Sequence, residues 1–165
     1  MNWSLLRTIL ILPGTALIYV PALLLWLGRG MWLAAPAGPG EWRLWLALAL
    51  GGAAVLLMGW TVRLFVGPGQ GTPAPWNPPQ RFVVLGPYRH VRNPMICGVI
   101  AGQLAEALAF GSWLLAAWAL VFFAVNAVYF PLSEEKGLER RFGEDYRRYK
   151  ANVPRWLPRL TPWTP

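Results

Sequence analysis

The sequence predicts an all-α membrane protein with about four transmembrane helices, the last two forming a helical hairpin, followed by a C-terminal amphipathic helix. The 165 residues are 56% hydrophobic and only 13% charged, whereas soluble domains carry about 25% charged residues. Apolar stretches long enough to cross a hydrocarbon core of ~30 Å recur along the chain. Lys and Arg gather after Gly67, at predicted membrane boundaries. This charge pattern is typical of a membrane protein whose basic segments set its orientation.

Two apolar stretches within residues 1–66 form an N-terminal pair of predicted transmembrane helices. Leu5–Leu27 and residues 44–66 are each long enough to span the bilayer. The first stretch exceeds the roughly 7–15 apolar residues of a signal peptide and lacks a small-residue cleavage site, so we expect it to be retained. Residues 28–43 are a short connection rich in Gly and Pro.

Residues 67–165 form the second predicted part of the same membrane domain. Its apolar stretches, Pro94–Phe110 and residues 113–132, are separated only by Gly111-Ser112. This pair of residues leaves room for nothing longer than a tight turn, so the two helices are expected to form a hairpin.

The third predicted helix is short and contains two polar residues, Gln103 and Glu106. Ionisable side chains inside a membrane are costly and often functional. The alternative is that Glu106 lies close to the far interface or is protonated, and the sequence leaves the role of both residues open.

The segment after the fourth span, residues 133–150, is predicted to be an amphipathic helix. Its apolar residues follow one another at steps of four, four and three: Leu138, Phe142, Tyr146 and Tyr149. Ser133 is expected to cap the start of this helix, where Glu134 and Glu135 would interact favourably with the helix dipole.

The distribution of basic residues predicts the orientation. Loop 67–93 and the C-terminal tail carry most of them and are therefore expected in the cytoplasm. With four spans the N-terminus lies there too, in agreement with Arg7. We expect an integral protein of the inner or plasma membrane. Because the basic residues are divided among membrane boundaries, no nucleic-acid partner is expected.

A group of polar residues lies where loop 67–93 enters the membrane: Tyr88, Arg89, His90, Arg92 and Asn93. Pro94 suits the first turn of the next helix, and a helix N-terminus attracts anions. Arg92 and His90 are candidates to hold an anion there. The alternative is that these are basic side chains that extend to lipid headgroups.

Glu134 and Glu135 stand at the same membrane boundary, against the local positive bias. They either cap the helix dipole or bind a cationic or hydroxyl-rich ligand. One cysteine and one histidine do not make a metal site, so none is expected.

Four motifs in a fixed order resemble a known superfamily. They are Gly-Thr-Pro-Ala-Pro-Trp-Asn-Pro-Pro (71–79), Leu-Gly-Pro-Tyr-Arg-His-Val-Arg-Asn-Pro-Met (85–95), Glu-Glu-Lys-Gly-Leu (134–138) and Phe-Gly-Glu-Asp-Tyr-Arg-Arg-Tyr-Lys-Ala-Asn-Val-Pro-Arg (142–155). Together they resemble the isoprenylcysteine carboxyl methyltransferase and phospholipid methyltransferase superfamily of integral membrane enzymes. The first two spans match it only as hydrophobic helices.

The resemblance implies a cytoplasm-facing site for S-adenosyl-L-methionine, with Arg92 and Glu134 as the catalytic pair. Arg92, with His90, would pair with the cofactor carboxylate, and Glu134 would meet its ammonium or ribose hydroxyls. The remaining implied cofactor-binding residues are Tyr88, Asn93, Pro94 and Met95, the backbone of Phe82, Val83, Val84 and Leu85, and a Gly-x-Gly element formed by Gly69 and Gly71.

Two departures from the superfamily bear on the acceptor. Many relatives have His-Pro-x-Tyr where this chain has Asn93-Pro94-Met95-Ile96. The prenylcysteine enzymes carry an Arg four residues before the Glu-Glu pair, and this chain has Phe130 there. The change removes the group that would hold a prenylcysteine carboxylate but does not affect the methyltransferase assignment.

The expected function is methyl transfer to a lipidic or small hydrophobic acceptor in the membrane, either an isoprenylcysteine-type carboxylate or a phospholipid amine. One alternative is an NADPH-dependent, steroid-reductase-like enzyme, but such enzymes have Glu where this chain has Val99. Another is a non-enzymatic membrane scaffold, which would not need Tyr88, Arg92 and Glu134 on one face. The sequence does not fix the oligomeric state.

Overall fold

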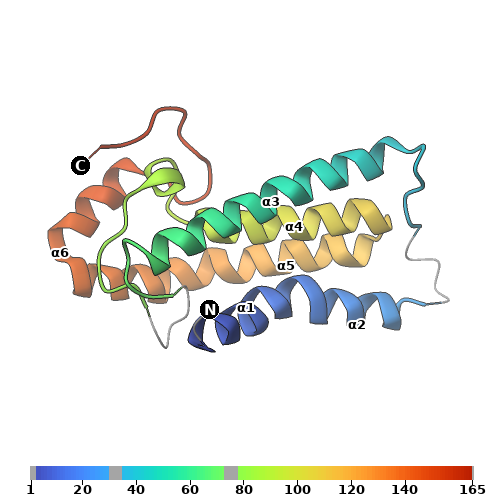
Figure 1. Cartoon of the computed structure of the whole chain (residues 1–165), viewed down its shortest axis with the longest axis horizontal. Coiled ribbons are helices and arrows are strands. Elements are labelled where there is room, and N and C mark those ends of the chain that lie inside the picture. Colours follow the sequence, from blue (N-terminus) through green and yellow to red (C-terminus); the bar gives the residue numbers. More distant parts are fainter. Residues whose placement is uncertain (1–2, 30–34, 73–77, 165) are drawn as a thin grey trace.

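The computed structural model describes residues 3–29, 35–72 and 78–164, and all regular structure in these ranges is helical. The long helices lie side by side, and the first and last described residues are at the same end of the bundle (Figure 1). Loop 67–93 and the helix α6 lie at that end too, and we call it the basic end. Residues 73–77 of the 71–79 motif lie outside the described residues.

The first span consists of α1 (Trp3–Gly14), a π-helical segment η1 (Thr15–Tyr19) and α2 (Val20–Leu27), and it agrees with the predicted helix. The wider, π-helical turn of η1 has a covalent cause, because Pro21 has no N–H to donate to the preceding turn. The N–H of Val20 bonds to the carbonyl of Thr15, and the carbonyl of Ala16 is left without a helical donor.

Two side chains from other helices donate to the carbonyl of Ala16. Trp118 Nε1 lies 3.0 Å from this oxygen and Gln103 Nε2 lies 3.3 Å from it. A buried polar side chain in the third span therefore completes the hydrogen bonding of the first, which gives Gln103 a structural role.

Helices α3 (Trp42–Val66) and α4 (Pro94–Phe110) pack closely along each other. Small residues permit this approach: a Cβ at Gly98 would lie 2.8 Å from Met58 Cγ, and Ala54 is buried at the same interface. Three helices are long and apolar enough to cross a membrane, and α4 is a shorter apolar helix of 17 residues. This agrees with the prediction of about four spans.

Gly111 ends α4 in the left-handed conformation (φ 54°), and α5 (Trp113–Tyr129) begins directly after Ser112. The predicted hairpin is confirmed. The helix then continues through a second π-helical segment, η3 (Phe130–Glu134), into α6 (Glu135–Asn152). The prediction that Ser133 caps a separate helix is wrong, because the backbone stays helical through it.

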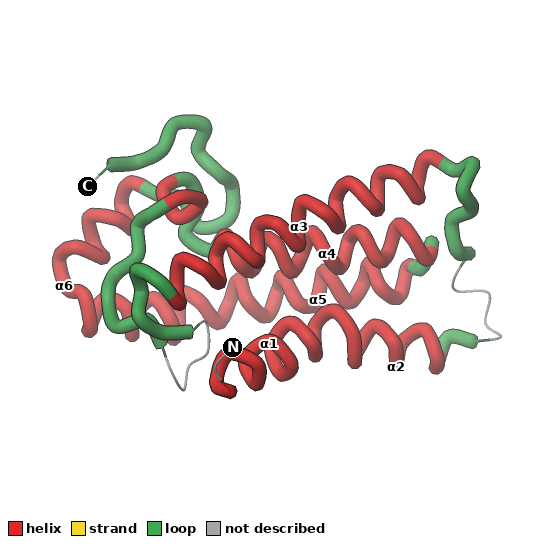
Figure 2. The backbone as a smooth tube through the Cα atoms, viewed as in Figure 1, coloured by secondary structure: helices red, strands yellow, loops and turns green. Residues whose placement is uncertain are grey.

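Helix α6 turns away from the direction of α5 (Figure 2). Gly143 has φ 54° and ψ −125° within it, a conformation that side-chain-bearing residues rarely adopt. The predicted apolar face is nevertheless confirmed. Tyr146 and Tyr149 are buried together with Val153, and the partly buried residues packed against them are Leu138, Phe142, Phe82, Val84 and Trp163.

After α6, residues 153–164 return across the basic end, and we call this segment the C-terminal strap (Figure 1). Its backbone pairs with residues 89–92: Arg92 N donates to Pro154 O at 2.9 Å, and Arg159 N donates to His90 O at 3.0 Å. Trp163 N donates to Arg89 O at 2.8 Å. The strap therefore holds the motif at 85–95 from outside the membrane bundle.

Candidate functional site

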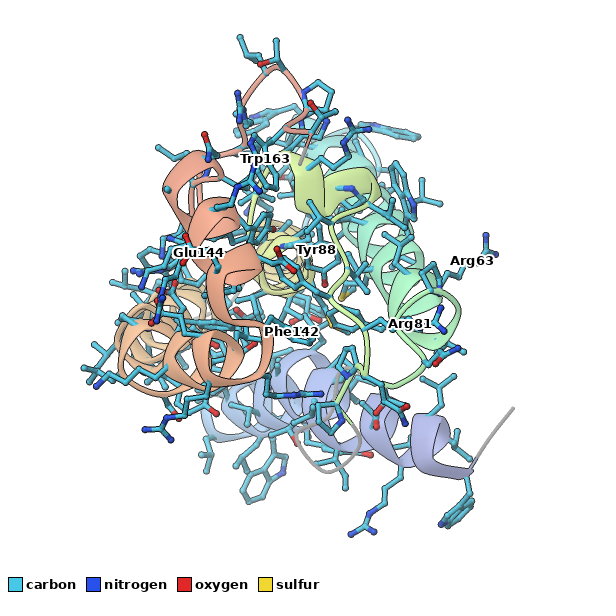
Figure 3. All side chains as sticks on the ribbon, turned by 90° about the vertical axis from the view of Figure 1, so that its left-hand side faces the viewer. Arg63, Arg81, Tyr88, Phe142, Glu144 and Trp163 are labelled. Carbon is cyan, nitrogen blue, oxygen red and sulfur yellow. The ribbon has the colours of Figure 1, made fainter. Side chains whose placement is uncertain are left out.

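The Gly86–Arg89 turn places Tyr88 inside the basic end. Gly86 has φ 53°, and a Cβ there would lie 2.9 Å from the Trp60 ring, so the turn requires glycine. The Tyr88 ring packs 5.3 Å from that of Phe65, and the Tyr88 carbonyl accepts a hydrogen bond of 2.7 Å from the hydroxyl of Tyr149. Figure 3 shows Tyr88 near the middle of this end, within the ring of surrounding helices.

Glu135 is the centre of a buried ion cluster. Arg92 Nη1 donates to Oε1 at 2.9 Å, Arg155 donates to both carboxylate oxygens at 2.7 and 3.1 Å, and Lys150 Nζ lies 3.5 Å away. Burial opposes ionisation, but the hydrogen bond from Arg155 and the charges of Arg92, Arg155 and Lys150 hold the pKa of Glu135 below its usual range. The cluster ties the 85–95 motif, α6 and the strap together.

Glu134 differs from its neighbour. It follows the last apolar residue of the span, Leu132, and its surface is exposed. Surrounding protein atoms and the charge of Glu135 raise the pKa of Glu134 to about 7. Burial, then Tyr149 and then Glu134 raise the pKa of Tyr88 well above its ordinary value. Glu134 is thus exposed as a residue, while its carboxyl is partly desolvated by surrounding protein atoms and lies close enough to Tyr88 to influence that hydroxyl.

Two buried donors in the 85–95 motif have no partner in the described part of the chain, Arg92 Nε and Asn93 Nδ2. The N–H groups of residues 82–85 also make no backbone hydrogen bond within this part. Buried polar groups in native structures normally have partners. The two buried side-chain donors are therefore suited to an anionic or carbonyl-bearing ligand.

The structure places several of the residues implied by the resemblance, Tyr88, Arg92, Glu134 and residues 82–85, at the basic end. Glu134 influences Tyr88, and Arg92 lies beside Tyr146, whose pKa is raised to about 12, mainly by burial. Phe82 packs in the aromatic cluster beneath α6, with its ring 5.1 Å from that of Phe142. Val83 is buried, Val84 is partly buried against the same cluster, and Leu85 is half exposed.

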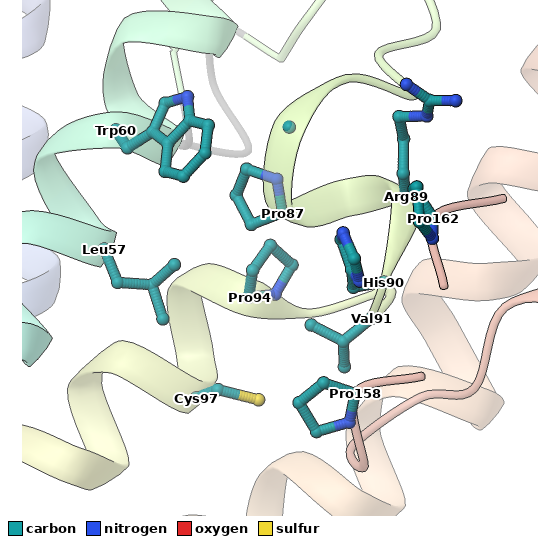
Figure 4. Close-up of a pocket in the computed structure, with 11 residues that line it drawn as sticks. Leu57, Trp60, Pro87, Arg89, His90, Val91, Pro94, Cys97, Pro158 and Pro162 are labelled. Atoms are coloured by element: carbon teal, nitrogen blue, oxygen red, sulfur yellow. The ribbon is translucent and has the colours of Figure 1, made fainter. Parts of the chain in front are cut away.

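His90 is placed differently from Tyr88 and Arg92. Its Nδ1 lies 2.8 Å from the carbonyl oxygen of Arg159, so one ring nitrogen is used to hold the strap. His90 and Pro94 both line an apolar pocket whose lining does not include Tyr88, Arg92 or Glu134 (Figure 4). Met95 follows in the first turn of α4 and is partly buried.

Gly69 and Gly71 are explained by close packing. A Cβ at Gly69 would lie 2.7 Å from Phe65 O, and one at Gly71 would lie 2.7 Å from Pro78 O. The amide of Gly69 donates to Leu64 O and that of Gly71 donates to Phe65 O. Both amides are used within the chain, and a cofactor role for these glycines stays a prediction.

Sequence reasoning missed the ion cluster around Glu135. Both Glu135 and Arg155 belong to the motifs that carry the resemblance. Their pairing depends on the strap returning to the bundle, and no local pattern in the sequence indicates this return.

The chain matches one known protein family. The sequence model of the phospholipid methyltransferase family matches residues 42–145, which is more than half of the chain and includes α3, the 85–95 motif, the hairpin and the Glu-Glu pair. None of the curated proteins compared with the chain matches it. The match confirms the resemblance that the motifs predicted, and with the long apolar helices it identifies the chain as an integral membrane methyltransferase of the phospholipid methyltransferase family.

Proposed function

We propose that the protein transfers a methyl group from S-adenosylmethionine to a lipidic acceptor, at a site in the basic end. The observation that carries this proposal is that hydrogen-bond donors and a carboxyl group from two of the motifs lie close together. Arg92 Nε and Asn93 Nδ2 are buried donors that have no partner among the described residues, and Glu134, an exposed residue, lies nearby, beside Tyr88.

These residues fit the methyl donor. Its amino-acid part carries a carboxylate, which suits the donors of Arg92 and Asn93, and an ammonium, which suits Glu134. The amides of residues 82–85, which make no backbone hydrogen bond within the described part of the chain, suit the acceptor atoms of a nucleoside. Tyr88, which is buried with its ring against Phe65, would lie beside the adenosyl part.

When bound, S-adenosylmethionine supplies a methyl group on a positively charged sulfur, and transfer leaves the electron pair of the broken C–S bond on that sulfur. The protein's contribution is to position the reactants and exclude water. Arg92 is held by Glu135, so its guanidinium is fixed before any ligand arrives. Glu134 has no hydrogen bond within the described chain and remains available to a ligand.

The surroundings of Phe130 favour an amine acceptor over a carboxylate. Phe130 is buried, and its ring packs 5.9 Å from Tyr129 and 5.7 Å from Trp156. The position that holds an arginine in prenylcysteine enzymes is thus filled here by an aromatic side chain among aromatic neighbours. A phospholipid amine, approaching from the cytoplasmic leaflet, is therefore the acceptor we propose, with the basic end in the cytoplasm according to the positive-inside rule.

The test is calorimetric titration of the detergent-purified protein with S-adenosylhomocysteine, with NADPH in parallel. We expect saturable binding of the first only. Asn93→Leu is an informative variant, because the amide has no partner in the described chain whose loss would affect folding. It should weaken binding about tenfold, the usual range for a lost hydrogen bond to a charged group.

A second variant is Glu134→Gln, and its matched control is Glu144→Gln, an exposed glutamate of α6 that pairs with the exposed Arg147. Folding of each variant is checked by circular dichroism. Binding of NADPH instead would move the protein to the reductases. Binding of neither ligand by folded protein would contradict the proposed function.

A further inference from the structure

An apolar pocket of about 420 Å³ lies under the C-terminal strap (Figure 4). This volume lies within the range of about 300–1,000 Å³ typical of small-molecule sites. The pocket is built from three parts of the chain that are far apart in sequence. Its main lining residues are Leu57 and Trp60 of α3, Pro94 and Cys97 of α4, and Pro158 and Pro162 of the strap.

The pocket lies at the level where the membrane-spanning helices end. Leu57 and Trp60 belong to the C-terminal part of α3, and Pro94 is the first residue of α4. The strap passes beside these helix ends rather than beyond them (Figure 1). The pocket is therefore at the boundary between the hydrocarbon core and the headgroups of the leaflet at the basic end.

Its outer rim is apolar and exposed. Trp60, which lines the pocket on α3, is 53% exposed, and Leu157, next to the lining residue Pro158 of the strap, is 80% exposed. Large apolar side chains on both walls of one opening are costly in water and favourable against lipid. Trp60 is also of the residue type enriched at membrane interfaces. These exposures indicate that the pocket opens sideways to the bilayer.

One arginine lines the pocket, and a second one follows the lining residue Pro158 in the strap. Arg89 is among its lining residues, and Arg159 is on the strap between Pro158 and Pro162. Each guanidinium has five N–H donors, and the structure uses one of Arg89 for Trp163 O and one of Arg159 for Asn152 O. The remaining donors suit a phosphate group.

We propose that this pocket binds one hydrocarbon chain of a bilayer phospholipid, with the phosphate held by Arg89 and Arg159. The lipid would lie against the 85–95 motif, in a pocket whose lining does not include Tyr88, Arg92 or Glu134. A phospholipid that is itself the methyl acceptor and a resident phospholipid share this chemistry. Only the first source rests on the proposed function.

The experiment uses the full chain in vesicles containing phosphatidylethanolamine with a diazirine in one acyl chain, or phosphatidylglycerol with the same chain. After irradiation, crosslinked peptides are mapped by mass spectrometry. We expect crosslinks on the α3 segment around Leu57, on the start of α4 and on the strap. Leu57→Trp fills the pocket and should reduce them at least about fivefold, because a well-packed site tolerates added volume poorly.

Leu56→Trp is the matched control, because Leu56 is the neighbouring residue on α3, is 76% exposed and is not among the residues that line the pocket. It should leave the crosslinks unchanged. Cys97→Phe fills the pocket from α4 and provides a second variant if Leu57→Trp fails to fold. Crosslinks that persist at full yield in both filled variants, or that map only to the other helices, would overturn the proposal.

Titration with S-adenosylhomocysteine separates this result from the proposed function. A chain that crosslinks through the pocket but does not bind S-adenosylhomocysteine would support the lipid site and contradict the methyltransferase site. Equal crosslinking of the two probes would support a resident lipid. Preferential crosslinking of phosphatidylethanolamine would support the pocket as the site of the acceptor chain.

Discussion

The two π-helical segments of the molecule share one backbone feature and differ in what surrounds it. In η1 the wide turn precedes Pro21, and the freed carbonyl of Ala16 receives hydrogen bonds from Gln103 and Trp118. In η3 the turn contains Pro131 and leads directly into the Glu134-Glu135 pair. The first region is completed by the protein itself, and the second leaves polar groups available.

The second turn decides which glutamate is buried. A π turn adds a residue to the helical register, which rotates all later side chains by about 100° relative to an uninterrupted α-helix. Glu135 thereby faces Arg92 and is buried, and Glu134 is exposed. Polar groups that the chain satisfies itself are structural, and those that it leaves open are the candidates for ligand binding.

The largest expected effect is at Glu135. Glu135→Gln leaves Arg92, Arg155 and Lys150 without their shared carboxylate, whose side chain is only 4% exposed. Breaking a buried ion pair on one side costs about 3 kcal/mol or more. The free energy of unfolding, measured by SDS titration in mixed micelles, should fall by this amount. A variant as stable as wild type would show that the cluster does not hold the strap.

The next effect is at Glu134. Glu134→Gln should weaken S-adenosylhomocysteine binding about tenfold, as expected for loss of a charge-assisted hydrogen bond. Its stability should stay close to that of wild type, because the residue is exposed and makes no hydrogen bond within the described part of the chain. Calorimetry and SDS titration on the same preparation measure both quantities. Normal affinity would remove Glu134 from the site.

Gln103→Leu should give a smaller effect, and it should lower stability rather than ligand binding. The carbonyl of Ala16 loses one donor and keeps Trp118. Hydrogen bonds between membrane helices contribute about 1 kcal/mol on average. The unfolding free energy should fall by that amount with ligand binding unchanged. A loss of binding without a loss of stability would instead give Gln103 a direct functional role.

The smallest expected effect is a pH dependence. The pKa of Glu134 is raised from 4.5 to about 7, so the free folded protein retains a proton that the unfolded chain has lost between these values. The contribution of Glu134 to stability therefore decreases as the pH rises through this window. A ligand with an ammonium group favours the ionised carboxyl, so affinity should rise about threefold from about pH 6 to about pH 8. Glu134→Gln should abolish this rise, and a rise that persists in the variant would assign it to another group.

The membrane-spanning part was predictable because its signals are local. Hydropathy gave the first, second and fourth spans, and Gly111 with Ser112 gave the hairpin turn. The spacing of Tyr146 and Tyr149 gave the buried face of α6. Each of these features depends on residues within a few turns of one another.

The features that were missed depend on backbone geometry or on distant pairing. Ser133 reads as a helix cap, but helical φ and ψ continue through it. Arg155 lies 20 residues after Glu135, and only the returning strap brings them within 2.7 Å. The same strap draws His90 towards Arg159. The sequence thus pointed to the candidate motif at 85–95, whose role stays a prediction, but not to the residues that hold this motif in place.

The most direct test of the central claim measures ligand binding and stability together in Glu134→Gln and Gln103→Leu, with Glu144→Gln as the control. The account predicts that Glu134→Gln loses affinity for S-adenosylhomocysteine at nearly wild-type stability, and that Gln103→Leu loses stability at wild-type affinity. If Glu134→Gln bound normally, or if both variants lost affinity only in proportion to stability, the basic end would not be the methyl-donor site.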